Sequence, residues 1–225
     1  MPFADSHTHI DLADFDSDRP ALLERAAAAG VERMLLVAQA DDSAGLDRGL
    51  TVARDCGLKV SGGLHPHEAI HWTESLRDRL SALGKARRIC AIGEIGLDFH
   101  YDHSPRDQQR EAFRQQIRIA RDALLPVIIH TREADDETVA ILAEEKAAEV
   151  GGVIHCFTGT QALAEAALGM GVLHFVFGHR LFRERRSFAR DRENGSARSV
   201  PGRDRLPLPR PAPPPRQEER TGVCG

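Results

Sequence analysis

Histidine and glutamate residues follow several short apolar segments of this chain, where their side chains could bind metal ions. They are His7 and His9 in D-S-H-T-H-I-D, Glu94 in G-E-I-G, His130 in V-I-I-H and His155 in V-I-H-C. Two histidines separated by one residue on a strand project from the same face, so both imidazoles can reach one ion. A carboxylate between apolar residues is costly to bury unless it meets a cation. Together these residues predict a divalent metal site built from separate strand ends.

Each of these residue types also has a purely structural explanation. A lone histidine at the end of an apolar run can be a hydrogen-bonded core residue, and a lone glutamate can form a salt bridge. The prediction rests on the repeated placement of such residues in one alternating pattern, which core packing does not readily produce. Mixed nitrogen and oxygen ligands suit Zn, Mn or Mg, and the sequence does not choose among these metals.

The elements that must position these residues alternate along the chain. Short apolar runs predict strands at residues 3–6, 33–38, 59–63, 89–93, 126–129 and 152–154. Amphipathic or alanine-rich stretches predict helices at residues 20–29, 44–56, 74–83, 106–123, 134–146 and 161–168. Strands that alternate with helices favour a parallel sheet covered on both faces. We therefore expect an α/β fold, a TIM (β/α)8-type barrel truncated after about six βα units, with a doubly wound sheet as the alternative.

Composition places the chain among ordinary globular proteins. Its 225 residues suit one domain, and 41% of them are hydrophobic, which is enough to build a core. No apolar run approaches the ~18 residues of a membrane span, and the N-terminal residues M-P-F-A-D do not resemble a signal peptide. We expect a cytoplasmic protein with no membrane association.

Six motifs resemble those of one protein family. The segments D-S-H-T-H-I-D, G-L-H-P-H, A-I-G-E-I-G-L-D-F-H-Y, Q-x-x-x-F-x-x-Q-I-x-x-A, L-P-V-I-I-H-T-R and G-V-I-H-C-F-T-G are similar to segments of the TatD family of metal-dependent deoxyribonucleases. They occur in the family's order and cover residues 3–171. The resemblance implies a TIM-barrel hydrolase of the amidohydrolase-like superfamily. It also implies two divalent metal ions and a DNA substrate, single-stranded or at 3' ends, cleaved by a 3'-5' exonuclease.

The resemblance also implies roles for the metal-binding residues. His7 and His9 are expected to bind one ion, Glu94 to bridge two ions, and His130 and His155 to bind the second. Two ions of this kind polarise a phosphate and lower the pKa of bound water.

Further residues near the predicted strand ends are candidates for catalysis or substrate binding. Glu94 is counted among the catalytic residues, together with His65 and His67 of G-L-H-P-H, which could transfer a proton or contact phosphate. Arg132 could bind a phosphate, and Asp98 could bind substrate or orient a ligand imidazole. The alternatives are structural imidazoles and a surface ion pair. Three further residues are expected to line the mouth of the site: His100, Tyr101 and His103.

The chain changes character after Gly171. Residues 172–178 could form a strand, but the remainder is rich in arginine and then in proline, and seven of the twelve prolines lie beyond residue 200. Such a segment buries too little apolar surface to offset the entropy of ordering. We therefore expect an incomplete barrel over residues 1–171 and a mostly disordered, non-homologous tail over residues 172–225.

The tail departs from the family pattern in a systematic way. Residues 172–180, 201–211 and 214–218 can be encoded by DNA that, at one constant offset, reads F-Y-I-S-F-S-G-I, L-V-E-T-D-S-P-Y-L-A and H-R-G-K. These are family segments in family order, and the aspartate of the second is a metal ligand in the family. It would be encoded across Arg205 and Leu206. We therefore expect a frameshift near Gly171, in the gene or in its sequencing.

Loss of the last strands and of this ligand has consequences for the chain as written. An incomplete barrel leaves sheet edges open, so we expect poor folding and very low nuclease activity. Two alternatives stay open: an amidohydrolase-like hydrolase of a substrate other than nucleic acid, and a non-catalytic remnant with a basic tail.

Overall fold

Strands and helices alternate throughout the part of the chain that the structure describes. The structure is a computed structural model, and it describes residues 2–40 and 43–174. The strands are β1 Phe3–Thr8, β2 Val31–Gln39, β3 Lys59–Gly63, β4 Ile92–Asp98, β5 Val127–Arg132, β6 Gly152–Ile154 and β7 Val172–His174. The helices are α1 Arg19–Ala28, α2 Ser43–Cys56, α3 Glu74–Lys85, α4 Arg106–Ala123, α5 Asp135–Glu144 and α6 Gln161–Gly169. Short 3-10 helices are η1 Ala13–Phe15, η2 Pro66–His71 and η3 Ala147–Glu149.

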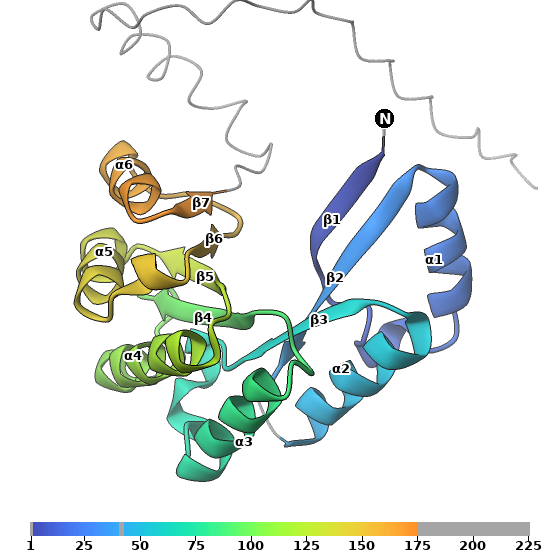
Figure 1. Cartoon of the computed structure of the whole chain (residues 1–225), viewed down its shortest axis with the longest axis horizontal. Helices are drawn as coiled ribbons and strands as arrows, with labels where there is room; N and C mark the ends of the chain where they lie inside the picture. Colours follow the sequence, from blue (N-terminus) through green and yellow to red (C-terminus); the bar gives the residue numbers. More distant parts are fainter. Residues whose placement is uncertain (1, 41–42, 175–225) are drawn as a thin grey trace, which may run out of the picture. The chain divides into compact units, whose positions relative to one another are not determined.

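The strands form one parallel sheet whose spatial order follows the sequence, β1-β2-β3-β4-β5-β6-β7. The sheet curves, and the helices lie along its outer side (Figure 1). A doubly wound sheet reverses its strand order at a switch point, whereas a barrel adds each strand beside the preceding one. The expected TIM-type α/β fold is therefore confirmed. Among the described residues, β1 and β7 are the two edges of the sheet.

Helix α4 shows how local sequence and packing agree. Pro105 precedes its first residue, and Leu124 ends it in the left-handed conformation. Its buried residues recur at helical spacing along one face, and Phe113 on that face is fully buried. The helix packs against β4, the strand that carries Glu94.

The sheet has an outer face toward the helices and an inner face on which ligand-type side chains lie. On β5, Val127 and Ile129 belong to the main apolar core, while Ile128 belongs to a separate cluster with Val37. Side chains alternate between faces along a strand, so His130 shares the inner face with Ile128. Ligand-type side chains therefore project to the side of the sheet opposite the helices.

The predicted strand limits differ from the observed ones where the site begins. The strand predicted at 89–93 is β4 Ile92–Asp98, and the strand predicted at 126–129 is β5 Val127–Arg132. The apolar runs end at Glu94 and His130, but the backbone continues to pair beyond both residues. Both residues therefore lie within strands, not after them.

The region after Gly171 is described only in part. Strand β7 occupies the start of the strand predicted at 172–178, and it pairs with β6. The rest of the predicted tail falls on residues 175–225, outside the described residues, so its disorder and the domain boundary stay predictions. No helix within residues 2–40 and 43–174 is long and apolar enough to cross a membrane.

Packing of α4 against the sheet gives a test of the core. Phe113 is 0% exposed, so Phe113→Ala should lower the free energy of unfolding by about 3–5 kcal/mol because it removes apolar contacts and leaves a cavity. Leu124, which is 72% exposed, is the matched control, and Leu124→Ala should change stability by about 0.5 kcal/mol or less. Urea denaturation measures both, and equal effects would contradict the packing described.

Candidate metal centre

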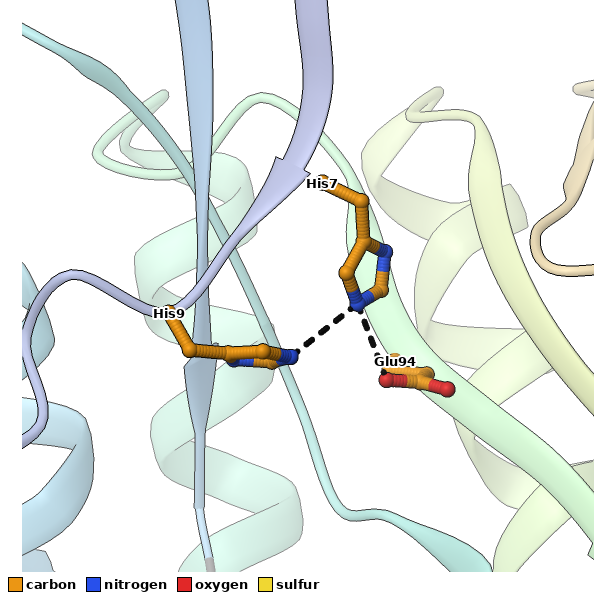
Figure 2. Close-up of side chains that lie close together, drawn as sticks. All are labelled: His7, His9 and Glu94. Carbon is orange, nitrogen blue, oxygen red and sulfur yellow. Dashed lines mark hydrogen bonds and ion pairs between the residues drawn. The ribbon is translucent and has the colours of Figure 1, made fainter. Parts of the chain in front are cut away.

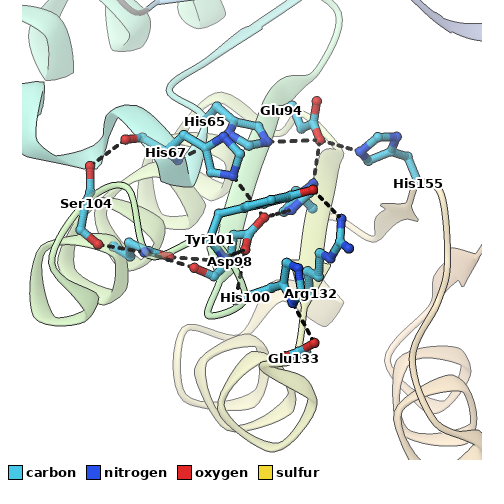
Figure 3. A network of polar contacts seen from close by, with 12 residues as sticks. His65, His67, Glu94, Asp98, His100, Tyr101, Ser104, Arg132, Glu133 and His155 are labelled. Carbon is cyan, nitrogen blue, oxygen red and sulfur yellow. Dashed lines mark hydrogen bonds and ion pairs between the residues drawn. The ribbon is translucent and has the colours of Figure 1, made fainter.

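The carboxylate of Glu94 lies at the centre of a group of histidines. Glu94 is only 3% exposed. Its Oε2 is 3.3 Å from His7 Nε2, and its Oε1 is 3.1 Å from His130 Nδ1 and 3.6 Å from His65 Nε2. His155 Nε2 also lies against Oε1 (Figure 3). Four segments far apart in the sequence thus converge on one carboxylate.

This carboxylate is held in its ionised form. Burial alone would raise the pKa of Glu94, but the imidazoles of His130, His155 and His7 outweigh burial and hold the pKa well below its usual value. Glu94 therefore presents a buried negative charge to the surrounding ring nitrogens, as an anionic metal ligand does.

His7 and His9 form one half of the centre (Figure 2). Their Nε2 atoms are 3.1 Å apart, and His9 Nδ1 is 3.0 Å from the carbonyl oxygen of Val37. A carbonyl only accepts hydrogen bonds, so His9 Nδ1 carries the hydrogen and neutral His9 offers the lone pair of Nε2. With Glu94 these residues form a group whose ligand atoms all lie within 4.8 Å of one another.

Asp98 orients the histidines of the other half. Its Oδ2 is 2.9 Å from His67 Nε2 and 3.0 Å from His130 Nε2, and its Oδ1 accepts from the backbone N–H of His100 and of Tyr101. Burial would raise the pKa of Asp98, but these hydrogen bonds outweigh burial and lower it. The carboxylate is therefore an acceptor, and Nε2 of His130 carries a hydrogen.

The arrangement of His130 fits a bound cation. With its hydrogen on Nε2, neutral His130 directs the lone pair of Nδ1 at Glu94 Oε1, 3.1 Å away. Two acceptors this close require a proton or a metal ion between them. Burial lowers the pKa of His130, but Glu94 and Asp98 raise it by more. The same groups thus stabilise a proton on Nδ1, and a divalent ion can take its place.

His65 differs from the other imidazoles. Its Nδ1 accepts a hydrogen bond from the backbone N–H of His67 at 3.2 Å, so its hydrogen lies on Nε2, facing Glu94. Burial lowers the pKa of His65 to about 3. His65 is therefore neutral at ordinary pH and presents an N–H group to the centre.

Two buried glutamines of α4 had no predicted role and hold the backbone near the site. Gln116 accepts from the N–H of Leu64 at 2.7 Å and donates to its carbonyl oxygen at 3.1 Å. Gln109 makes the same pair of bonds to Asp98, at 2.8 and 3.1 Å, and also donates to Ser104. The sequence signal for both was an amide on the apolar face of an amphipathic helix.

Gly96 allows β4 to approach β5 beside the site. It has a φ of +142°, and a Cβ there would lie 1.9 Å from the carbonyl oxygen of His130. Only glycine meets both conditions. The short G-E-I-G segment therefore brings the strands of Glu94 and His130 together.

Arg132 lies at the rim of the centre. It is the last residue of β5 and lines a cavity of about 890 Å³ that His130 and His155 also line. The structure thus brings every predicted site residue into one region. Their assigned roles stay predictions. The residues are His7, His9, His65, His67, Glu94, Asp98, His130, Arg132 and His155.

Two curated relatives resemble this chain over about three-quarters of its length. The uncharacterized metal-dependent hydrolase YabD of Bacillus subtilis is 39% identical over 175 residues, covering 77% of this chain and 68% of the relative. The 3'-5' ssDNA/RNA exonuclease TatD of Cronobacter turicensis is 37% identical over 171 residues, covering 76% of this chain and 64% of that protein. The chain therefore spans about two-thirds of the length of these relatives.

A solved structure and a family model agree with these relatives. YjjV, a TatD homologue from Escherichia coli K12, superposes with a TM-score of 0.74 at 31% sequence identity, covering 84% of this chain and 73% of that one. The model of the family described as TatD related DNase matches residues 4–198. The expectation drawn from the six motifs is confirmed, and this chain belongs to the TatD family.

Proposed function

We propose that this chain is a divalent-metal-dependent hydrolase that cleaves phosphodiester bonds of DNA, acting as a 3'-5' exonuclease. The observation that carries the proposal is the buried, ionised carboxylate of Glu94, which imidazoles from several strands surround. A relative named as a 3'-5' ssDNA/RNA exonuclease supports the choice of a nucleic acid substrate.

In this proposal the centre holds two divalent ions, of Mg, Mn or Zn. His7 and His9 would hold one ion and His130 and His155 would hold the other, while Glu94, which contacts His7, His130 and His155, would serve both. When bound, such ions supply electrophilic polarisation of the phosphate. The hydrogen bond from His9 to the Val37 carbonyl and that from His130 to Asp98 fix the ring orientations that this requires.

His65 acts as a hydrogen-bond donor in the proposed reaction. Its Nδ1 lone pair is already engaged by the backbone N–H of His67, so a neutral His65 cannot accept a proton without losing that bond. Its Nε2–H faces the centre and can donate to a phosphate oxygen. Between the two catalytic roles proposed for His65, the geometry favours phosphate contact over proton transfer.

Substitution of Glu94 tests the metal-dependent reaction. Glu94→Gln keeps the shape but removes the charge, so EDTA-sensitive release of nucleotides from single-stranded DNA should fall by at least about 100-fold, beyond the ~10–100-fold typical of residues that only support a ligand. Glu74→Gln is the matched control, since that side chain is 88% exposed. Release that persists in EDTA, or that Glu94→Gln leaves intact, would contradict the proposal.

We further propose that a frameshift near Gly171 changes the sequence of the tail, although Val172–His174 still pair with β6 and the family model extends to residue 198, and that the chain is impaired because a metal-ligand aspartate is lost. A DNA read across codons 165–180, followed by an assay of the chain with the frame restored, tests this. We expect the restored chain to release nucleotides at least about 10-fold faster, because a sixth ligand completes the centre. An unshifted read, with no gain from the altered frame, would contradict it.

The pKa of His65 gives a pH test of the site. The usual pKa of a histidine is near 6.5, so below that pH the unfolded chain takes up a proton at His65. In the folded chain the pKa of His65 is about 3, so the proton is taken up only near pH 3. Unfolding therefore binds protons in this window, and the free energy of unfolding falls as pH drops from about 6.5 toward 3.

His65→Gln should lose less stability than the wild type between pH 7 and pH 4. Urea denaturation in EDTA measures the difference, with the same substitution at the exposed His71 as the control. If the free energy of unfolding depends on pH in the same way for the wild type and for His65→Gln, burial does not keep His65 neutral.

A further inference from the structure

Two glutamines of α4 bind the backbone at the ends of neighbouring strands. Gln109 and Gln116 are 0% and 1% exposed. They lie about two helical turns apart, so both side chains leave the same face of the helix. Gln116 accepts from the N–H of Leu64 and donates to its carbonyl oxygen. Gln109 makes the same two bonds to Asp98. One helix therefore holds the chain just after β3 and at the last residue of β4.

These amides take the place of a sheet ladder. Among the described residues, the ladder between β3 and β4 consists of the pair Gly62 and Ile92. Beyond that pair, the peptide groups of Leu64 and Asp98 bind glutamine instead. A buried N–H or carbonyl without a partner is costly, and one amide offers a donor and an acceptor at once. Each glutamine therefore fixes a strand end that the sheet itself leaves unpaired on this side.

The two residues held in this way lead to different parts of the centre. Leu64 is followed directly by His65, whose Nε2 is 3.6 Å from Glu94 Oε1 (Figure 3). Asp98 carries a functional side chain of its own, and its Oδ2 is 3.0 Å from His130 Nε2. A shift of Leu64 thus moves a hydrogen-bond donor, whereas a shift of Asp98 moves the carboxylate that orients a candidate metal ligand.

Ser104 keeps the two effects apart. His67 binds Asp98 at 2.9 Å, so a shift that began at Leu64 and reached His67 would disturb the carboxylate as well. The buried hydroxyl of Ser104 donates to the carbonyl oxygen of His67 at 2.6 Å and accepts from the N–H of Ile70 at 3.1 Å. These bonds hold His67 independently of Leu64. A displacement at Leu64 therefore does not extend to the Asp98 carboxylate.

We propose that Gln109 and Gln116 are positioning residues with separate targets. Gln109 fixes Asp98 and, through it, the metal ligand His130, while Gln116 fixes the hydrogen-bond donor His65. The proposal rests on the function proposed above, in which His130 binds an ion and His65 contacts a phosphate oxygen. Both amides are engaged by the backbone, so each glutamine acts only through the residue that it holds.

Zn²⁺ affinity separates the two roles without an assay of activity. Gln109→Met keeps the side-chain volume but releases Asp98, so it should weaken Zn²⁺ binding to the full chain by about 10-fold or more, as loss of a group that supports a ligand does. Gln116→Met removes the same kind of bonds from the same helix and should leave Zn²⁺ affinity unchanged. Gln115→Met is the matched control, since that amide binds the Trp72 side chain at 2.9 Å. Competition with a chromophoric chelator measures all three.

Inorganic phosphate tests the target of Gln116. In the full chain at saturating Zn²⁺, calorimetry should show that Gln116→Met weakens phosphate binding by about 10-fold, because a hydrogen bond to a charged group is lost. His65→Ala should have the same effect, and adding Gln116→Met to His65→Ala should weaken binding no further. Where a methionine variant does not fold, glutamate replaces it, since glutamate retains the bond from the backbone N–H.

Equal loss of Zn²⁺ affinity in Gln109→Met and Gln116→Met, or a loss in neither, would overturn the separate targets. A further loss of phosphate affinity when Gln116→Met is added to His65→Ala would overturn the role of Gln116. EDTA-sensitive release of nucleotides is read separately. A chain that shows the expected Zn²⁺ and phosphate affinities but releases no nucleotides supports the positioning roles and contradicts the proposed nuclease function.

Discussion

The buried negative charge of Glu94 is the constraint on which the rest of the site depends. A carboxylate that is 3% exposed loses its hydration, and within the described part of the chain imidazoles supply the contacts that replace it. Those imidazoles come from β1, the loop after β3, β5 and the residue after β6. The sheet must therefore curve and keep its strands in sequence order, so that its inner face gathers them around one point.

Asp98 extends this constraint outward. Backbone N–H groups and the amide of Gln109 fix Asp98, and Asp98 in turn fixes two imidazoles and the backbone of Tyr101. The backbone thus fixes the position of a carboxylate. This carboxylate in turn fixes the candidate ligand His130 and the backbone at the mouth of the site. Such supporting hydrogen bonds set the tautomer and orientation of imidazoles in metal centres.

The sequence predicted those parts of the molecule that repeat a local pattern. Helix α4 was predicted at its observed limits because proline precedes it and its buried face is periodic. The strands of Glu94 and His130 were predicted to end too early, because polar residues on the inner face interrupt the apolar runs while the ladder continues. Gln116 could not be assigned a role, because its partner is the backbone of Leu64, 52 residues away.

Anomalous scattering from crystals grown with Zn²⁺ tests directly whether Glu94 and the surrounding histidines bind metal, since it locates metal ions without reference to activity. We expect anomalous peaks on the inner face of the sheet, about 2.0–2.2 Å from the Glu94 carboxylate and from ring nitrogens of the surrounding histidines. Peaks only elsewhere on the protein, with the Glu94 carboxylate bound to protonated imidazoles alone, would contradict it.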